Sequence, residues 1–186
     1  MQLTSIPPTP GSIDPSRLAQ ELVFISADLE ESEWLAAIAY PGTKVVILDP
    51  EQDGIAQITH ALKLAIQPIR RLHILAHGAP GRLQTGADGF SLKTLSRYAK
   101  ELIGWRSHLS QDATMLLYGC NVACDATGEH FVHALHHLTG AAIAASTTLI
   151  GHDSRGGNWT LDYQIGDVYP KLAFPRSVIA AYAHTL

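Results

Sequence analysis

Cysteine is scarce in this chain of 186 residues, which has only Cys120 and Cys124. Two cysteines are too few for a disulfide framework. Their C-x3-C spacing also differs from the redox C-x-x-C motif and from half of a familiar zinc site. We therefore expect free thiols, and the reactivity of each thiol becomes the question.

Charge is also low, since 16% of the residues are charged and the net charge is −4. The longest basic cluster is the pair Arg70 and Arg71, so no basic patch is available to follow a phosphate backbone. Nucleic acid is not an expected partner. The sequence also lacks a G-x-S-x-G elbow, a G-x-G-x-x-G motif and a P-loop, which argues against a serine hydrolase and a nucleotide-binding enzyme.

Long apolar runs are absent, because no run approaches the roughly 18 residues that a membrane-spanning helix needs. We expect no membrane insertion. The first seventeen residues, "MQLTSIPPTPGSIDPSR", lack the basic-then-apolar layout of a secretory signal and contain four prolines. Residues 1–19 are therefore predicted to form a proline-rich leader outside the core.

Short apolar runs alternate with helical patterns over the rest of the chain, whose hydrophobic content of 46% suits one sizeable core. We predict one α/β domain over residues 20–168 and a C-terminal extension over 169–186. The predicted strands are residues 22–26, 44–49, 70–77, 113–120 and 141–146. The predicted helices are residues 30–40, 53–66, 91–109 and 128–140, with a small hairpin in the glycine-rich stretch before residue 91.

This alternation predicts a mainly parallel sheet with helices on both faces and right-handed crossovers. Trp159, Leu161, Tyr163 and Ile165 alternate with polar residues. That pattern indicates a half-buried strand at an antiparallel edge near the C-terminus.

A histidine and a cysteine end two consecutive predicted strands. His77 closes the strand 70–77, and Cys120 closes the strand 113–120. Ligands and chemistry gather at the carboxyl ends of strands in open α/β sheets. If the two strands are adjacent, with their axes about 4.8 Å apart, His77 and Cys120 are placed to act as base and nucleophile.

Glycine accompanies both residues. Gly78 follows His77 and lets a bare backbone approach a substrate, while Gly119 removes bulk directly before Cys120. The N–H groups of Gly78 and Cys120 are therefore candidate oxyanion donors. The alternative is that Cys120 is a small buried hydrophobe and His77 a turn residue.

The blocks "LHILAHG" and "MLLYGC" resemble the caspase-like cysteine peptidase superfamily, which includes legumain, gingipain and separase. Together with "DGIAQITHAL", "TGAAIAAST" and "GGNWTLD", they also resemble a bacterial domain of unknown function found near the N-terminus of large repeat-bearing surface or secreted proteins. The resemblance covers roughly residues 20–168. It implies a caspase-like three-layer sandwich, with His77 as general base, Cys120 as nucleophile and the amides of Gly78 and Cys120 as oxyanion donors.

Substrate selection is expected at loops that follow the strands. The candidate substrate-binding residues are Asp28 and Ser146, together with Asp125, Thr147 and Asp153. An acidic pocket would select arginine or lysine by charge complementarity. The alternative is that these residues are helix caps and turn formers.

The other histidines and the second cysteine are candidates for metal binding or other chemistry. His133 and His137 share a helical face with Glu129, but the pattern lacks the base of H-E-x-x-H and has no evident third ligand. A solvated helix face explains the cluster at residues 130–137 equally well, so no metal or other cofactor is predicted. Cys124 is expected to pack or cap, and His73 to be a satisfied core histidine.

Two hypotheses of function follow. The first is a cysteine endopeptidase that uses His77 and Cys120 on a peptide, with its parent chain or a neighbouring surface protein as substrate. The second is a non-catalytic module of the same fold that binds peptide or anchors a larger protein. The sequence leaves the oligomeric state and the localisation open.

Overall fold

The structure is a computed structural model and describes residues 20–186. The predicted leader, residues 1–19, lies outside the described residues. Six strands form the main sheet in the order β2-β1-β3-β7-β8-β9. They are β1 (Glu21–Ser26), β2 (Lys44–Leu48), β3 (Ile69–Leu75), β7 (Leu109–Tyr118), β8 (Ala142–Ala145) and β9 (Tyr163–Ile165). All neighbours are parallel except β8 and β9, which are antiparallel.

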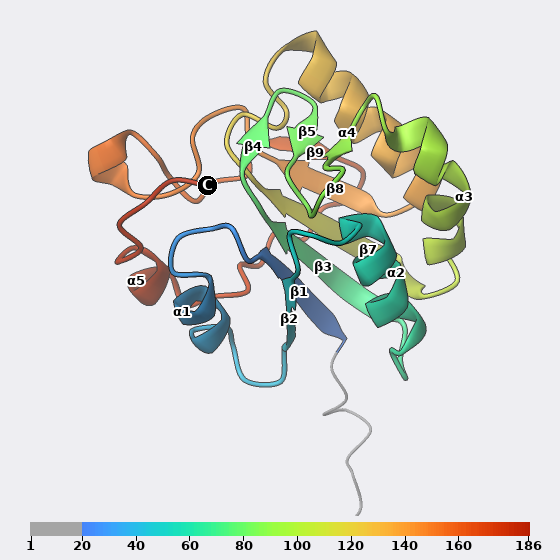
Figure 1. Cartoon of the computed structure of the whole chain (residues 1–186), viewed down its shortest axis with the longest axis horizontal. Coiled ribbons are helices and arrows are strands. Elements are labelled where there is room, and N and C mark those ends of the chain that lie inside the picture. The colour runs from blue at the N-terminus through green and yellow to red at the C-terminus, as the bar shows by residue number, and fades with distance from the viewer. Residues whose placement is uncertain (1–19) are drawn as a thin grey trace, which may run out of the picture.

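Helices cover both faces of this sheet (Figure 1). One face packs against α2 (Gly54–Lys63), α3 (Leu95–Trp105) and α4 (Asp125–Thr139), and we call it the first face. The other, called the second face, packs against α1 (Ser32–Ala37), α5 (Arg176–Ile179) and the C-terminal segment. The predicted fold class is confirmed: the domain is a mainly parallel α/β sandwich with an antiparallel edge, consistent with a caspase-like sandwich.

Continuous apolar runs form the central strands because both faces of the sheet are covered. In β1, Leu22 and Phe24 belong to the core under the first face, while Val23 and Ile25 belong to the core under the second. All four side chains are at most 1% exposed. The period of two along a strand thus divides one apolar run between two cores.

Helix α2 begins as its sequence predicts. The Asp53 carboxylate accepts hydrogen bonds from the N–H groups of Ile55 and Ala56, at 2.9 and 3.0 Å, and so caps the helix. The helix ends at Lys63, shorter than the predicted 53–66, and leaves the side chain of Ile66 78% exposed. The apolar spacing therefore continues to Ile66, beyond the end of the helix at Lys63.

Helix α3 also differs from its predicted span of 91–109. Phe90 and Ser91 form strand β6 (Phe90–Ser91), and the Ser91 N–H donates to the Thr94 hydroxyl at 3.0 Å, which holds a turn before the helix. The next strand, β7, already begins at Leu109, so the helix must end earlier. Pairing with neighbouring strands decides these boundaries rather than helical periodicity.

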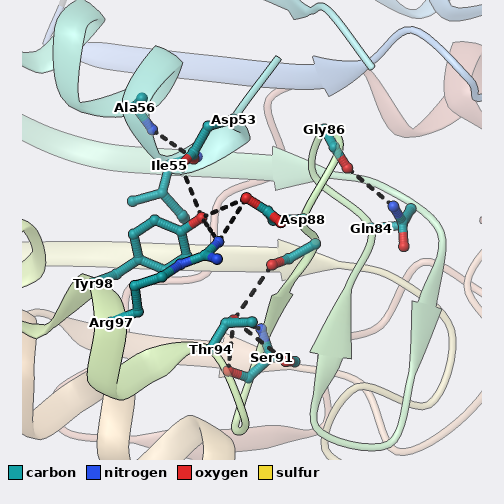
Figure 2. A network of polar contacts seen from close by, with 11 residues as sticks. Asp53, Ile55, Ala56, Gln84, Gly86, Asp88, Ser91, Thr94, Arg97 and Tyr98 are labelled. Atoms are coloured by element: carbon teal, nitrogen blue, oxygen red, sulfur yellow. Dashed lines mark hydrogen bonds and ion pairs between the residues drawn. The ribbon is translucent and has the colours of Figure 1, made fainter. Parts of the chain in front are cut away.

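The glycine-rich stretch after β3 forms a small second sheet. Its strands are β4 (Gly78–Ala79), β5 (Arg82–Leu83) and β6, joined in antiparallel order. A network of polar contacts joins this sheet to α2 and α3 (Figure 2). In it, the Tyr98 hydroxyl donates to the Asp53 carboxylate at 2.8 Å, and Arg97 pairs with Asp88 at 2.6 Å. Polar contacts therefore connect the glycine-rich stretch after His77 to both α2 and α3.

The C-terminal residues 169–186 pack on the second face of the sheet. Five of their side chains are buried there: Ala173, Phe174, Ile179, Tyr182 and Leu186. The predicted edge strand is present only as β9, and Asn158 before it forms an isolated bridge to Ile150. Within the described residues, no helix combines the length and apolar character needed to cross a membrane.

Candidate functional site

The register of β3 and β7 brings His77 and Cys120 to equivalent places. Leu75 pairs with Tyr118 at the end of this parallel ladder. His77 and Cys120 each lie two residues further along. The prediction that these two strands are neighbours is confirmed, and both residues lie at the carboxyl edge of the sheet.

The glycines let the two strand ends approach each other closely. A Cβ on Gly78 would lie 2.6 Å from the backbone nitrogen of Cys120, and a Cβ on Gly119 would lie 2.6 Å from Cδ2 of Leu83. Neither position has room for a side chain. The backbone of Gly78 therefore packs directly on the backbone of Cys120.

The thiol of Cys120 is buried and is held by backbone groups. The Ile150 N–H donates to the Sγ atom across 3.3 Å, and the thiol lies 3.6 Å from the Ile150 carbonyl oxygen. Burial raises the pKa of Cys120, and the backbone N–H groups of Ile150 and Leu186 offset that rise in part. The thiol is therefore protonated at neutral pH in this conformation.

His77 is half-buried and follows β3, the strand next to β7, which precedes Cys120. Its carbonyl oxygen accepts the N–H of Gln84 at 2.8 Å, which anchors the loop after β3 to β5. Across residues 20–186, no hydrogen bond connects the His77 ring to Cys120, whose sulfur is bonded to Ile150 instead. The structure thus brings the two residues to adjacent strand ends without joining their side chains.

A strained turn follows Cys120. Asn121 has a φ of 59°, in the left-handed region that asparagine tolerates better than most residues. The N–H groups of Asn121 and Ala123 donate to the carbonyls of Thr148 and Ser146, each at 2.9 Å. This turn is therefore fixed to the loop after β8. Among the described residues, the N–H of Cys120 has no hydrogen-bond acceptor.

Two predicted substrate-binding residues lie apart from each other. The Ser146 side chain is fully buried, and its hydroxyl donates to the Thr148 carbonyl at 3.1 Å. Asp28 is exposed in the turn after β1, and β3 separates that strand from β7. Ser146 thus holds the loop beside Cys120, while Asp28 is not brought to the thiol by any contact of the described residues.

The other acidic and polar candidates make local contacts. The Asp125 carboxylate accepts the Thr127 N–H at 2.7 Å in the first turn of α4, which begins three residues before the predicted start at residue 128. The Thr147 N–H donates to Asp162 at 2.8 Å. Asp153 is exposed in a short 3-10 turn. These contacts are the helix caps and turns of the alternative interpretation.

In the described residues, Cys124 and the histidine cluster at residues 130–137 do not form a common binding site. Both cysteines are free. In the part of the chain that the structure describes, no group of three or more His, Cys, Asp or Glu side chains is placed to hold a metal ion. His133 is exposed and lies edge-on to Tyr163, with ring centroids 6.5 Å apart.

The prediction that His73 is a core histidine is confirmed, but the expectation that its ring is satisfied is wrong. The ring is fully buried, but neither of its nitrogens has a hydrogen-bond partner among residues 20–186. It stacks on Tyr118 at 6.0 Å between centroids, and burial lowers the pKa of His73 to about 4. The Tyr118 hydroxyl and the Trp159 indole nitrogen are likewise buried without a partner in that range. No motif marks these residues, because only the tertiary structure gathers them.

The fold and the strand-end geometry define a class: a mainly parallel α/β domain with histidine and cysteine at the carboxyl ends of adjacent strands. The chain belongs to a family described as a domain of unknown function (DUF4347), which matches residues 22–186. Comparison with curated proteins and with solved structures gave no match.

Proposed function

We propose that this domain is a cysteine endopeptidase of the caspase-like type, with Cys120 as nucleophile and His77 as general base. One observation carries the proposal: the two residues occupy equivalent positions beyond the Leu75–Tyr118 pair of adjacent parallel strands. The packing of Gly78 on Cys120 supports it, because it sets the backbones of the two candidate oxyanion donors side by side. So does the Cys120 N–H, which has no acceptor in the described chain.

The chemistry follows from these positions. His77 takes the thiol proton, and the thiolate of Cys120 attacks the peptide carbonyl to form a tetrahedral intermediate. The N–H groups of Cys120 and Gly78 donate to the oxyanion. The C–N bond then breaks, His77 returns the proton to the leaving amine, and water hydrolyses the acyl-enzyme to regenerate the thiol. Before attack, the Sγ atom must exchange Ile150 for His77 as its partner.

The substrate class follows from the resemblance to domains of bacterial surface proteins. We propose the parent chain or a neighbouring surface protein as the substrate, with the peptide laid across the carboxyl edge of the sheet. Selection of a basic residue would require an acidic side chain near the thiol. Asp28, Asp125 and Asp153 are exposed candidates for that role, and none of them contacts the thiol in this conformation.

The second candidate function is a non-catalytic module that binds peptide or anchors a larger protein. The environment of Cys120 favours it, because the thiol is buried, bonded to the Ile150 backbone and raised in pKa. Burial and the raised pKa lower the fraction of nucleophilic thiolate. The two candidates therefore differ in what happens to this thiol when a peptide binds.

The test is cleavage and covalent labelling of the full chain with an unbiased peptide library and an electrophilic peptide probe, read by mass spectrometry. Cys120→Ser and His77→Ala are the test variants, and Cys124→Ser is the matched control because it also removes one free thiol. We expect cleavage and labelling by the wild type and Cys124→Ser, and loss of cleavage of at least ~100-fold in the other two.

Uncleaved peptides and an unlabelled Cys120, under reducing conditions with and without calcium, would reject the peptidase. Binding of peptides from the library without cleavage would then support the module. Labelling at Cys124 in place of Cys120 would contradict the assignment of Cys120 as the nucleophile.

A further inference from the structure

Residues 183–186, here called the strap, lie along the loop that holds the Cys120 thiol. Two backbone hydrogen bonds of 2.9 Å join the strap to this loop, from the His152 N–H to the His184 carbonyl and from the Leu186 N–H to the Ile150 carbonyl. Between these two bonds, Gly151 and Thr185 form an antiparallel bridge. The strap is therefore an extended chain that pairs antiparallel with residues 150–152.

The loop has no room for a side chain where the strap crosses it. A Cβ on Gly151 would lie 2.2 Å from the His184 carbonyl oxygen and 2.6 Å from the Cα of Thr185. The φ of Gly151 is 136°, which side chains other than hydrogen disfavour. A glycine inside a paired segment is typical of a place where another backbone approaches closely. Residues 150–152 thus accept an extended chain at this point.

The strap also reaches the proposed nucleophile. The Leu186 N–H, which donates to the Ile150 carbonyl, interacts with the Cys120 thiol as well and partly offsets the rise that burial causes in the pKa of Cys120. Cys120 itself is only 6% exposed. An extended backbone therefore lies next to the nucleophile, which is where a peptide must lie before its carbonyl is attacked.

One side chain anchors the strap. Leu186 is 4% exposed and belongs to the core under the second face, whereas the other three strap residues are exposed or half-buried. The residue before the strap is fixed separately, because the Tyr182 hydroxyl donates to the Glu30 carbonyl at 3.0 Å and its ring stacks on Trp34. The strap and the chain before it are thus held by different contacts.

We infer that the strap occupies the position of the substrate, so that a substrate peptide binds as an extended strand antiparallel to residues 150–152, with a large apolar side chain where Leu186 lies. This inference rests on the proposed peptidase, and it names the substrate class and the regulation of that site. The domain is latent while the strap is bound, because strap and substrate compete for the backbone groups of Ile150 and His152. Release of Leu186 opens the site, while Tyr182 keeps the preceding chain on the sheet.

The first experiment measures binding without turnover, in the full chain with Cys120→Ser. The probe is a fluorescent, capped peptide with the sequence YAHTL of residues 182–186, followed by fluorescence anisotropy. The same peptide with aspartate in place of leucine is the control ligand. Leu186→Asp is added to release the strap, because it puts a charge where an apolar side chain is buried. Ala181→Ser, an exposed change outside the strap, is the matched control variant.

We expect the YAHTL peptide to bind the Leu186→Asp chain about tenfold more tightly, or better, than the chain with an intact strap, since burial of one leucine changes an equilibrium constant by that much. Ala181→Ser should bind as the chain with an intact strap does. The aspartate peptide should bind more weakly than the leucine peptide. Leu186→Ala is a milder second variant that should change affinity in the same direction, and near-ultraviolet circular dichroism checks that each variant folds.

The second experiment uses the same variants with Cys120 intact, so that failure of this inference is distinct from failure of the peptidase. Cleavage of the peptide library should rise about tenfold in Leu186→Asp, because the competing strap is released, and should stay at the wild-type rate in Ala181→Ser. The cleaved peptides should share leucine or a similar apolar residue at one fixed distance from the cut.

Equal affinity of YAHTL for chains with intact and released straps would overturn the inference, even if library peptides are cleaved. So would equal binding of the leucine and aspartate peptides, or cleavage that depends on a basic residue. Binding as expected without cleavage in any variant would support the strand site and reject the peptidase. Cleavage that is equal in the wild type and in both Leu186 variants would support the peptidase and reject the latent state.

Discussion

Single residues at the carboxyl edge of the sheet show how local chemistry depends on the backbone around it. Gly78 must be glycine because the backbone of Cys120 occupies the space of a side chain. His73, within strand β3 before this edge, is buried without a partner for its ring among the described residues. Both features have measurable consequences for stability.

We expect Gly78→Ala to destabilise the fold by roughly 1–3 kcal/mol, because its Cβ would meet the backbone of Cys120 at 2.6 Å. The matched control is Gly104→Ala in α3, where a Cβ meets no atom within 4 Å. That control should be stabilising by about 0.5–1 kcal/mol, since alanine favours helix. Urea unfolding of the three proteins checks both signs, and equal midpoints would contradict the close approach.

His73 should make stability depend on pH. Its pKa is near 6.5 when unfolded and about 4 when folded, so the unfolded chain binds the extra proton between these values. The contribution of the neutral ring is complete above pH 6.5 and is lost as pH falls toward 4, at up to about 1.4 kcal/mol per pH unit.

Urea unfolding at several pH values between 7 and 4.5 measures this slope. Replacement of the ring by an apolar one, in His73→Phe, should flatten it, while the exposed-site variant His60→Gln should leave it unchanged. A wild-type slope that survives in His73→Phe would assign the titration to another group.

At the scale of elements, the loop after β8 and the C-terminal residues jointly cover the proposed nucleophile. Gly151 forms an antiparallel bridge with Thr185, and the Leu186 N–H donates to the Ile150 carbonyl at 2.9 Å. The same Ile150 holds the Cys120 thiol. The loop after β8 and the C-terminal residues, which are far apart in the sequence, thus meet at Ile150, the residue whose backbone bonds the Cys120 thiol.

We expect deletion of residues 183–186 to speed alkylation of Cys120. The deletion removes the bridge at Gly151 and exposes the thiol, which lowers its pKa. This outweighs the loss of the Leu186 N–H, because burial is the larger effect on the pKa of Cys120. Iodoacetamide rates at pH 7.5, followed by peptide mapping, measure the effect. Cys124 is the internal control in the same protein, and an equal rise at both cysteines would indicate general loosening instead.

For the whole molecule, the sheet needs both of its covering layers. Phe174, Ile179, Tyr182 and Leu186 are at most 4% exposed. Burial of four such side chains contributes roughly 6–12 kcal/mol, which is comparable with the total stability of a domain. The residues that the sequence suggested as an extension therefore complete the second core.

We expect a chain truncated after residue 168 to lose cooperative unfolding, because the second face of the sheet would be exposed to water. Near-ultraviolet circular dichroism and thermal unfolding of the full and truncated chains measure this. The four-residue deletion of 183–186 serves as the milder comparison. A sharp transition at an unchanged temperature in the truncated chain would show that the second layer is dispensable.

The sequence by itself determined the strand order along the chain, the mainly parallel α/β class and the placement of His77 and Cys120 at strand ends. Apolar periodicity and glycine are local signals, and they need no knowledge of distant contacts. It also placed the start of α2 at residue 53, where Asp53 caps the helix, since capping involves residues only two or three apart.

Only the tertiary structure decided where the helices end, what holds the Cys120 thiol and which polar groups remain without partners. Ile150 and Leu186 reach Cys120 from residues 30 or more positions away, and Trp159 meets Tyr118 from another loop. Such contacts depend on how β8, β9 and the C-terminal segment pack on the sheet. Their positions carry no periodic or motif signal, because burial by distant segments is set by the three-dimensional arrangement of the whole chain.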